Sequence, residues 1–427
     1  MMNRKLFSWY RYDLRIRYFG VIFLISFAYF TISDTTAVNY PAAIPKRNHF
    51  KAIIPCPELA ETWQPLENDG CLMTNQGILI ETLDGGCQLA AVNENQLFNP
   101  ASALKLATSL AALEKWGPAH RFRTAFYADG FIDCQTHTLN GDLILYSEGD
   151  PTFRIGMATG LIKKLMQLGI RQVTGNLIIN GPFSINSNFD GVQSAQRVLQ
   201  KMQRLGLRIK GDIWWEKRTG HLLLSHYSKS LLDIIWFQNA HSSNPIAERL
   251  GDALGGTEAL TLYLIQYVGL ELEEILITHT SGLDYNRITL RGMLKILRKL
   301  YQWCQQNDVA VEKILPAAGV DPSTVTHRFH QDPYRGGILA KTGTLLETDC
   351  GVSALVGFIQ TPKYGLLVFA LFNTHGDVLT YQRWQNTFLK ALVDRSGGVI
   401  PFKAVPEAVE YVYGGNEIVP HFQFAGN

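Results

Sequence analysis

The sequence predicts a mixed α/β protein in which an antiparallel sheet is flanked by helices and carries an inserted α/β lobe. Strand-like segments lie on either side of Asp84-Gly85-Gly86, a hairpin signal, near the start of the fold. Helical patterns dominate residues 230–303, and three more strand-like segments follow between 338 and 372. The order is therefore sheet, helices and sheet again. At 427 residues the chain is too long for one ordinary core, so we expect two domains or one domain with an insertion.

The first elements lead directly to the start of a helix. Residues 77–80 and 88–92 are the two strands of the predicted hairpin. Pro100 and the good helix formers of residues 103–115, stopped by a Gly-Pro pair, predict a helix with Ser102 in its first turn.

The next part of the chain has a different pattern. It alternates short strands, expected at 143–146 and 176–180, with helices, expected at 156–168 and 198–205. We interpret residues 135–225 as a lobe inserted into the larger domain.

The second half returns to the larger domain. Residues 230–237 are helical in pattern, and apolar residues at helical spacing begin a second helix at Pro245. Residues 241–244 are thus a short junction between two helices. The remaining expected elements are helices at 258–268, 289–303 and 381–394 and strands at 338–340, 352–359 and 366–372. Residues past Gly397 are irregular in pattern.

The amino terminus has the layout of a secretory signal. An apolar run at residues 18–32, closed by Asp34, follows five basic side chains: Arg4, Lys5, Arg11, Arg15 and Arg17. The run is shorter than the about 20 residues that span a bilayer. We expect residues 1–37 to be a signal peptide or an N-terminal anchor, followed by a linker at 38–55. The protein is then exported to the periplasm or cell envelope, and residues 18–32 anchor it in the membrane if the signal is not cleaved.

Composition argues against two classes of site. The formal net charge is +2, and basic residues beyond position 50 are scattered among acidic ones, which argues against a nucleic-acid groove. No cysteine pair has metal-finger spacing, and His327 and His330 lack a third ligand, so we expect loop histidines and no metal.

All six cysteines lie beyond the signal, in what would be an oxidising space, and we expect one disulfide between Cys56 and Cys71.

Ser102 and Lys105 are the first candidate catalytic pair. A spacing of three brings the hydroxyl and the amine onto one face of a helix, about one turn apart. Leu104 and Ala107 are expected in the core, so the lysine stem is partly buried, which lowers its pKa. A neutral amine could accept the serine proton. About one or two Ser-x-x-Lys matches arise by chance in a chain of this length, so the motif requires support from elsewhere.

The triplet Lys341-Thr342-Gly343 ends the first of the late strands and is expected by chance only about 0.1 times in such a chain. One other interpretation is an edge strand with a protective lysine that turns at Gly343. A degraded phosphate loop at 336–342 is another. It fails because Ala340 stands where the loop needs glycine and a strand pattern follows.

Three motifs thus occur in order: Ser102/Lys105 at a helix start, Ser242/Asn244 between helices and Lys341/Thr342/Gly343 on a strand. Together they match the signature of penicillin-binding proteins and serine β-lactamases. Five further segments narrow the match: Gly149-Asp150-Pro151-Thr152, Ser281-Gly282-Leu283, Ala318-Gly319-Val320-Asp321, Arg328 and Ala340-Lys341-Thr342-Gly343-Thr344-Leu345. Over residues 77–373 the chain resembles the peptidase S13 family, the D-alanyl-D-alanine carboxypeptidases of the penicillin-binding protein 4 type.

This resemblance implies a penicillin-recognising serine transpeptidase fold, shared with β-lactamases, with extra domains between the first two motifs. The implied parts are a transpeptidase-like domain at 56–134 and 226–397, an inserted lobe at 135–225 and a C-terminal tail at 398–427. The insertion is shortened here between residues 180 and 193. Ser243 replaces the commoner aspartate, which we expect to be harmless because the family uses the flanking Ser and Asn side chains.

The resemblance also implies catalytic roles. Ser102 is the nucleophile and Lys105 its base. Ser242 and Asn244 relay a proton to the leaving amine and hold the substrate backbone. Lys341 is a second cation that discourages charge on Lys105. Whether Lys105 or Ser242 is the working base in each half-reaction stays open.

The implied substrate is a peptidoglycan stem peptide ending in D-Ala-D-Ala. Lys341 supplies charge to its carboxylate, and the motif residues Thr342, Gly343 and Thr344 bind it, with hydrogen bonds from the two threonines. The backbone N–H groups of Ser102 and Thr344 form the oxyanion hole.

The expected function is a penicillin-sensitive serine D-Ala-D-Ala carboxypeptidase, with D,D-endopeptidase activity left open. β-Lactam antibiotics are the expected covalent inhibitors. No cofactor, metal or nucleic acid is expected, and membrane contact only through an uncleaved N-terminal segment. The two alternatives are a serine β-lactamase of the same fold and a non-catalytic cell-wall-binding homologue.

Overall fold

The computed structural model describes residues 66, 68, 70–186, 190–403, 412–413 and 417–421. All of them belong to a unit that extends from Lys51 to Asn427. The expected signal segment, the linker and Cys56 lie outside the described residues. Within the described part, no helix is both long and apolar enough to cross a membrane.

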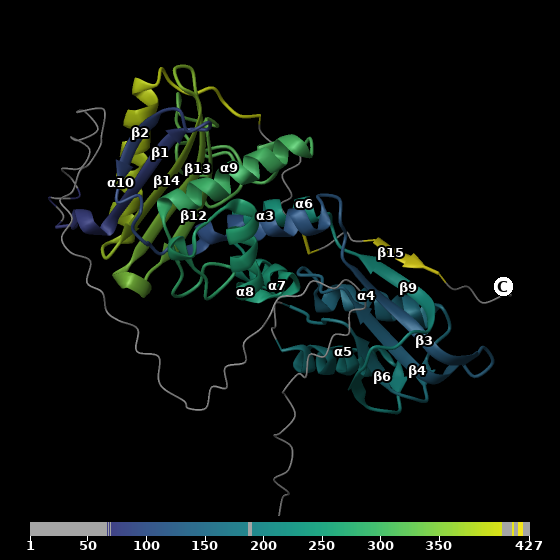
Figure 1. Cartoon of the computed structure of the whole chain (residues 1–427). Helices are drawn as coiled ribbons and strands as arrows, with labels where there is room; N and C mark the ends of the chain where they lie inside the picture. Colours follow the sequence, from purple (N-terminus) through teal and green to yellow (C-terminus); the bar gives the residue numbers. More distant parts are fainter. Residues whose placement is uncertain are drawn as a thin grey trace, which may run out of the picture. The chain divides into compact units, whose positions relative to one another are not determined.

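A five-stranded antiparallel sheet lies at the centre of the larger domain (Figure 1). Its strand order is β12-β13-β14-β1-β2. The strands are β1 (Gln76–Thr82), β2 (Gln88–Val92), β12 (Ile338–Leu345), β13 (Val352–Thr361) and β14 (Gly365–Thr374). Since β1 pairs with β14, the sheet joins the start of the fold to its last third, as the order of strand patterns predicts. Strand β12, which carries the Lys-Thr-Gly motif, lies at an edge.

Helices pack on both faces of this sheet (Figure 1). Side chains alternate along a strand, so Ile78 and Ile80 of β1 face one core whereas Leu79 faces the other. Helix α10 (Val378–Arg395) packs in the first core, and α3 (Lys105–Trp116) and α9 (Leu290–Gln306) pack in the second.

Helix α3 is central to the helical layer. It contacts α9 and three further helices: α6 (Leu231–His241), α7 (Asn244–Leu254) and α8 (Gly256–Tyr263). The predicted helix start is confirmed, with a 3₁₀ turn η3 (Ala101–Leu104) leading into α3. The predicted stop is confirmed as well, because Gly117 caps the C-terminus at a φ of 77°.

The inserted lobe has its own sheet and core (Figure 1). Its helices are α4 (Ile155–Gln167) and α5 (Gly191–Leu205). Its strands are β3 (Arg123–Asp133), β4 (Thr138–Ser147), β5 (Gln172–Val173), β6 (Leu177–Asn180), β7 (Arg208–Ile209), β8 (Ile213–Trp215), β9 (His221–Tyr227) and β15 (Glu417–Pro420). Helix α5 begins well before the expected residue 198, since Asp190 caps it by accepting a hydrogen bond from the Gln193 N–H at 3.1 Å.

Two boundaries differ from the sequence prediction. The expected start of the lobe at 135 falls inside the β3–β4 hairpin, whose pairing runs from Thr124↔Ser147 to Asp133↔Thr138. The lobe sheet therefore begins at Arg123. Strand β15 pairs with β9, although the tail past Gly397 was expected to be irregular. Pairing with a strand nearly 200 positions away, rather than any local pattern, forms β15.

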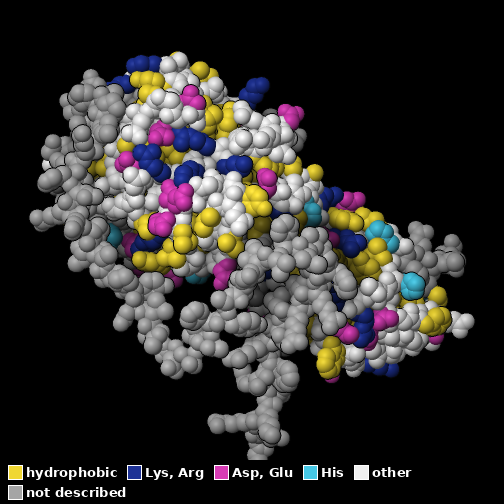
Figure 2. Space-filling view, in the orientation of Figure 1, with side chains coloured by type: hydrophobic (Ala, Val, Ile, Leu, Met, Phe, Trp, Pro, Cys, Tyr) yellow, Lys and Arg dark blue, Asp and Glu magenta, His cyan; other side chains and the backbone are white. Residues whose placement is uncertain are grey.

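Short elements complete the described chain. They are η2 (Met73–Asn75), the π-helix η4 (Leu264–Val268), η5 (Leu272–Glu274), β10 (Ile275–Leu276), β11 (Arg287–Ile288), η6 (Val311–Lys313) and η7 (Thr348–Cys350). All five described cysteines, Cys71 among them, are free thiols. On the face in Figure 2, basic and acidic side chains are intermixed, as the scattered charges in the sequence predict.

Candidate active site

The three motifs meet at one hydrogen-bonded centre. The Lys105 Nζ contacts the Ser102 Oγ at 2.7 Å and donates to the Asn244 Oδ1 at 2.6 Å, which joins the first motif to the second. The Lys341 Nζ donates to the Ser242 Oγ at 2.9 Å, which joins the second motif to the third. Residues that are far apart in the sequence therefore supply two hydroxyls, two amines and an amide to one small volume.

A strained turn presents Ser102. Ala101, the residue before it, has a φ of 45°, a conformation that is uncommon for residues other than glycine. The Asn99 Oδ1 accepts the Ala101 N–H at 3.0 Å, and the Asn99 Nδ2 donates to the Asp284 carbonyl at 2.9 Å and to the Asp349 Oδ2 at 3.1 Å. Asp349 in turn forms an ion pair with Arg287 at 2.8 Å. This network offsets the strain and fixes the turn that carries Ser102.

Gly343 allows the Lys-Thr-Gly strand to approach that turn. A Cβ atom at this position would lie 2.6 Å from the Pro100 carbonyl oxygen and 2.9 Å from the Ala101 Cβ. Any larger side chain would push β12 away from Ser102. The motif therefore needs glycine for a close backbone approach.

The junction between α6 and α7 places the second motif. Ser242 is the C-cap of α6 in the left-handed conformation, with a φ of 54°, and Ser243 is the N-cap of α7. This abrupt reversal directs the Ser242 hydroxyl to Lys341 and the Asn244 amide to Lys105. The short junction that the sequence predicts at 241–244 is confirmed.

The Lys105 amine is fully buried. Burial lowers its pKa to about 7, although the negative charge of Glu248 acts in the opposite direction. Besides Ser102 and Asn244, Nζ contacts the Ser281 carbonyl at 2.7 Å. A neutral amine has two N–H groups, which the Asn244 and Ser281 oxygens can accept, so its lone pair faces the Ser102 hydroxyl. The geometry suits a base for Ser102.

Lys341 is fully buried as well, and its Nζ donates to the Thr342 carbonyl at 2.7 Å. Burial, and secondly the charge of Lys105, hold its pKa well below the ordinary value of a lysine. We expected from the sequence that Lys341 is a fixed cation. In the free protein this environment disfavours a permanent charge on Lys341, because two ammonium groups would then share one desolvated site.

The edge of β12 offers groups for a ligand. Thr344 is exposed, and Thr342, two positions earlier, lies on the same side of the strand. The Thr342 Oγ1 donates to the Thr324 Oγ1 at 2.8 Å, so Thr324 also borders the site. The Ser102 N–H lies at the start of a helix, where the helix dipole favours negative charge.

Four residues of this centre were absent from the sequence prediction of site residues. They are Asn99, Glu248, Thr324 and, as a carbonyl that contacts Lys105, Ser281. One of them had a local signal, because Glu248 follows Asn244 by four positions and thus shares its helix face. The others reach the site through loops whose course no periodic pattern records.

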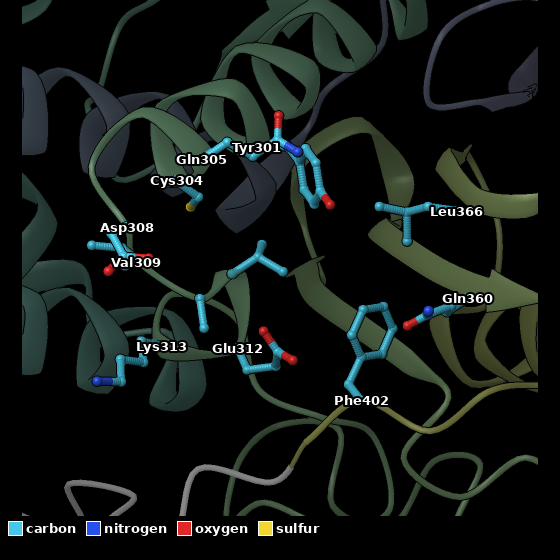
Figure 3. Close-up of a pocket in the computed structure, with 12 residues that line it drawn as sticks. Tyr301, Cys304, Gln305, Asp308, Val309, Glu312, Lys313, Gln360, Leu366 and Phe402 are labelled. Carbon is cyan, nitrogen blue, oxygen red and sulfur yellow. The ribbon is translucent and has the colours of Figure 1, made fainter.

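One cavity lies away from the three motifs. It has a volume of about 490 Å³ and is lined by the end of α9, by η6 and by residues such as Gln360 and Phe402 (Figure 3). None of its lining residues belongs to the three motifs. Among the described residues, no cluster of His, Cys, Asp and Glu side chains could hold a metal ion, and the His330 Nδ1 contacts the His327 carbonyl at 2.9 Å.

Comparison with known families decides the classification. The model of the D-Ala-D-Ala carboxypeptidase 3 (S13) family matches residues 64–190 and 182–387. The chain belongs to this family. A curated relative, the D-alanyl-D-alanine carboxypeptidase DacB of Haemophilus influenzae, is 28% identical over 196 residues. That match covers 42% of this chain and only 39% of the relative's length.

Solved structures show the same fold. The crystal structure of penicillin-binding protein 4 (dacB) from H. influenzae has a TM-score of 0.67 at 19% identity, and the match covers 79% of this chain and 99% of that one. Bd3459, a predatory peptidoglycan endopeptidase from Bdellovibrio bacteriovorus, has a TM-score of 0.61 at 20% identity, covering 77% and 94% of the two chains. The predicted S13 resemblance and the mixed α/β fold class are thus confirmed.

Proposed function

We propose that this S13 protein is a serine D-alanyl-D-alanine carboxypeptidase that hydrolyses peptidoglycan stem peptides through an acyl-enzyme on Ser102. The observation that carries the proposal is the 2.7 Å contact of the Ser102 Oγ with a buried lysine amine. D,D-endopeptidase activity at the same site stays open, since both reactions cleave an amide that follows a D-Ala carbonyl.

Substrate binding uses the edge of β12. The C-terminal carboxylate of the peptide accepts hydrogen bonds from Thr342 and Thr344 and lies near the Lys341 amine. An incoming carboxylate favours the charged form of Lys341, because opposite charge stabilises the ammonium. The peptide backbone extends along the strand edge, where the Asn244 side chain helps to hold it.

Acylation begins when the Ser102 Oγ attacks the penultimate D-Ala carbonyl and its proton passes to the Lys105 Nζ. The N–H groups of Ser102 and Thr344 stabilise the oxyanion that forms. The C–N bond then breaks, and the leaving D-Ala amine takes a proton by way of Ser242. Water hydrolyses the ester by the same steps in reverse order, which regenerates the Ser102 hydroxyl. No cofactor takes part.

The remaining assignments complete the proposal. Residues 1–37 act as a signal peptide or anchor, so the protein works in the periplasm or cell envelope. The lobe between the first two motifs, bounded by β3 and β9, is a separate domain that is shortened relative to the family. β-Lactams acylate Ser102 because they present a strained amide and a carboxylate in the same arrangement as the substrate.

Intact-protein mass spectrometry after incubation with penicillin tests the nucleophile. We expect one covalent adduct, which peptide mapping places on Ser102 and which Ser102→Ala abolishes. Ser243→Ala is the matched control, since this neighbouring serine of the second motif makes no capping hydrogen bond. An adduct on Ser109 or Ser242 overturns the assignment.

Turnover separates the rival functions. A carboxypeptidase releases D-Ala from a D-Ala-D-Ala peptide and holds penicillin as a long-lived ester. A β-lactamase hydrolyses penicillin rapidly and leaves the peptide intact, whereas a non-catalytic homologue does neither.

A further inference from the structure

A loop on the far side of Lys105 is held by one carboxylate. The Glu248 Oε1 accepts the Ser281 N–H at 3.0 Å, and its Oε2 accepts the Thr280 hydroxyl at 3.0 Å. The next group of this loop, the Ser281 carbonyl, contacts the Lys105 Nζ at 2.7 Å. Glu248 is therefore linked to Lys105 through a single intervening residue, Ser281.

The same helix face also contacts Lys105 directly. Asn244 and Glu248 lie four positions apart on α7, so their side chains project from the same face about one turn apart. Asn244 supplies one carbonyl acceptor to Lys105, and Glu248 fixes the loop that supplies the second. Helix α7 thus determines where both N–H groups of a neutral Lys105 amine point.

Close packing limits how far the loop can move. Gly251 of α7 contacts Thr280 so closely that a Cβ atom at this position would overlap the Thr280 side chain. The Thr108 hydroxyl of α3 donates to the Thr280 carbonyl at 2.6 Å, which ties the loop to the helix of the nucleophile. The loop is therefore clamped between α3 and α7.

We propose that Glu248 is a positioning residue for acylation, an inference that rests on the proposed function. Glu248 holds the Ser281 carbonyl against Lys105 and thereby directs the lone pair of the amine at Ser102. A neutral amine can accept the serine proton only if both its N–H groups point away from Ser102. The two carbonyl oxygens fixed by α7 enforce that orientation. Without Glu248 the Ser281 carbonyl loses its backbone anchor, and rotamers with an N–H toward Ser102 become accessible.

Glu248 has a second effect through its charge. Two titratable groups accompany Lys105 in this centre: Glu248 of α7, whose negative charge raises the pKa of Lys105, and the buried Lys341 of β12, whose own pKa the charge of Lys105 lowers. Asp252 of α7 interacts electrostatically with Glu248 as well: burial, and secondly the charge of Glu248, raise the pKa of Asp252, and Arg249 acts in the opposite direction. Removing the negative charge of Glu248 should lower the pKa of Lys105, because the ammonium form loses a stabilising partner.

The experiment compares Glu248→Gln and Glu248→Ala with wild type. The ionisation of Lys105 is followed by NMR of protein labelled with 13Cε-lysine, with Lys105→Met identifying the signal. Penicillin acylation rates are measured over the same pH range. Glu258→Gln is the matched control, an exposed carboxylate on α8 that is replaced in the same way.

In both Glu248 variants the pKa of Lys105 should be at least about half a unit lower than in wild type. The Gln side chain can still accept the Ser281 N–H, so the maximal acylation rate of Glu248→Gln should stay within about threefold of wild type. The maximal rate of Glu248→Ala should fall at least about tenfold below wild type. An unchanged Lys105 midpoint in both variants overturns the proposal, and so does wild-type acylation by Glu248→Ala. If wild type forms no Ser102 adduct, the proposed function fails, and the Lys105 titration still decides the role of Glu248.

Discussion

The Lys105 Nζ lies 2.7 Å from the Ser102 Oγ in a site that excludes water from the amine. Burial lowers the pKa of Lys105 to about 7, compared with about 10.4 for an unperturbed lysine. A large fraction of the amine is therefore neutral at physiological pH. The proposed base and the proposed nucleophile are therefore already in contact in the free protein.

Acylation by penicillin should depend on pH through this amine. The base is the neutral form, so the rate should rise as pH increases and level off above the Lys105 pKa, with a midpoint near pH 7. Stopped-flow acylation rates between pH 5 and 9 give the profile. A rate that keeps rising up to pH 10 would mean that the base has an ordinary lysine pKa.

Arginine substitutions should separate the two lysines. A guanidinium stays protonated, so Lys105→Arg should reduce the acylation rate by at least about a thousandfold, which corresponds to roughly 4 kcal/mol in the barrier. Lys341→Arg keeps a cation near the substrate carboxylate and should retain partial activity, limited by the larger head group. The measurement is the penicillin acylation rate at pH 8. Equal rates for Lys105→Arg and wild type would assign the base to Ser242 or to a water molecule.

Asn99 should support acylation without touching the substrate. Asn99→Ala removes the acceptor of the Ala101 N–H and the two donor contacts that hold the strained turn. We expect the acylation rate to fall about tenfold, roughly 1.4 kcal/mol, because Ser102 loses its fixed orientation. Asn95→Ala, an exposed asparagine of the same loop, is the control. A wild-type rate for Asn99→Ala would show that packing alone sets the turn.

Asp150 of the lobe should make stability depend on pH. Burial raises its pKa to about 6, and its Oδ2 has no hydrogen-bond partner among the described residues. Between about pH 4 and 6 the folded state binds a proton that the unfolded state does not, so stability falls as pH rises, by about 3 kcal/mol in total. Asp150→Asn should remove this contribution. The free energy of unfolding of Asp150→Asn relative to wild type should therefore increase from pH 4 to pH 7.

Urea denaturation at each pH gives these free energies. Asp84→Asn is an informative control, because hydrogen bonds from Thr82 and Gly86 lower the pKa of Asp84 and its effect has the opposite sign. If the pH dependence of Asp150→Asn equals that of wild type, Asp150 ionises normally in the folded protein.

The sequence by itself determined the elements that carry the motifs. Each of these elements follows from a local signal. Pro100 marks the helix start at Ser102, and a second helical pattern that begins at Pro245 marks the junction at 241–244. A run of strand formers marks the strand of Lys341. The order of the three motifs predicted the penicillin-binding protein and serine β-lactamase signature, and five further segments narrowed the match to the S13 family. These features depend on neighbouring residues, so a linear pattern records them.

Only the tertiary structure decided which groups contact Lys105 and how burial shifts the pKa of the two lysines. The Glu248–Ser281–Lys105 chain of contacts joins α7, a loop and α3, and the low pKa of Lys341 arises from burial beside a second amine. Strand β15 and the start of the lobe at Arg123 likewise depend on pairing between distant segments. Burial and electrostatic fields are properties of packed neighbours in space, and no spacing of residues along the chain specifies them.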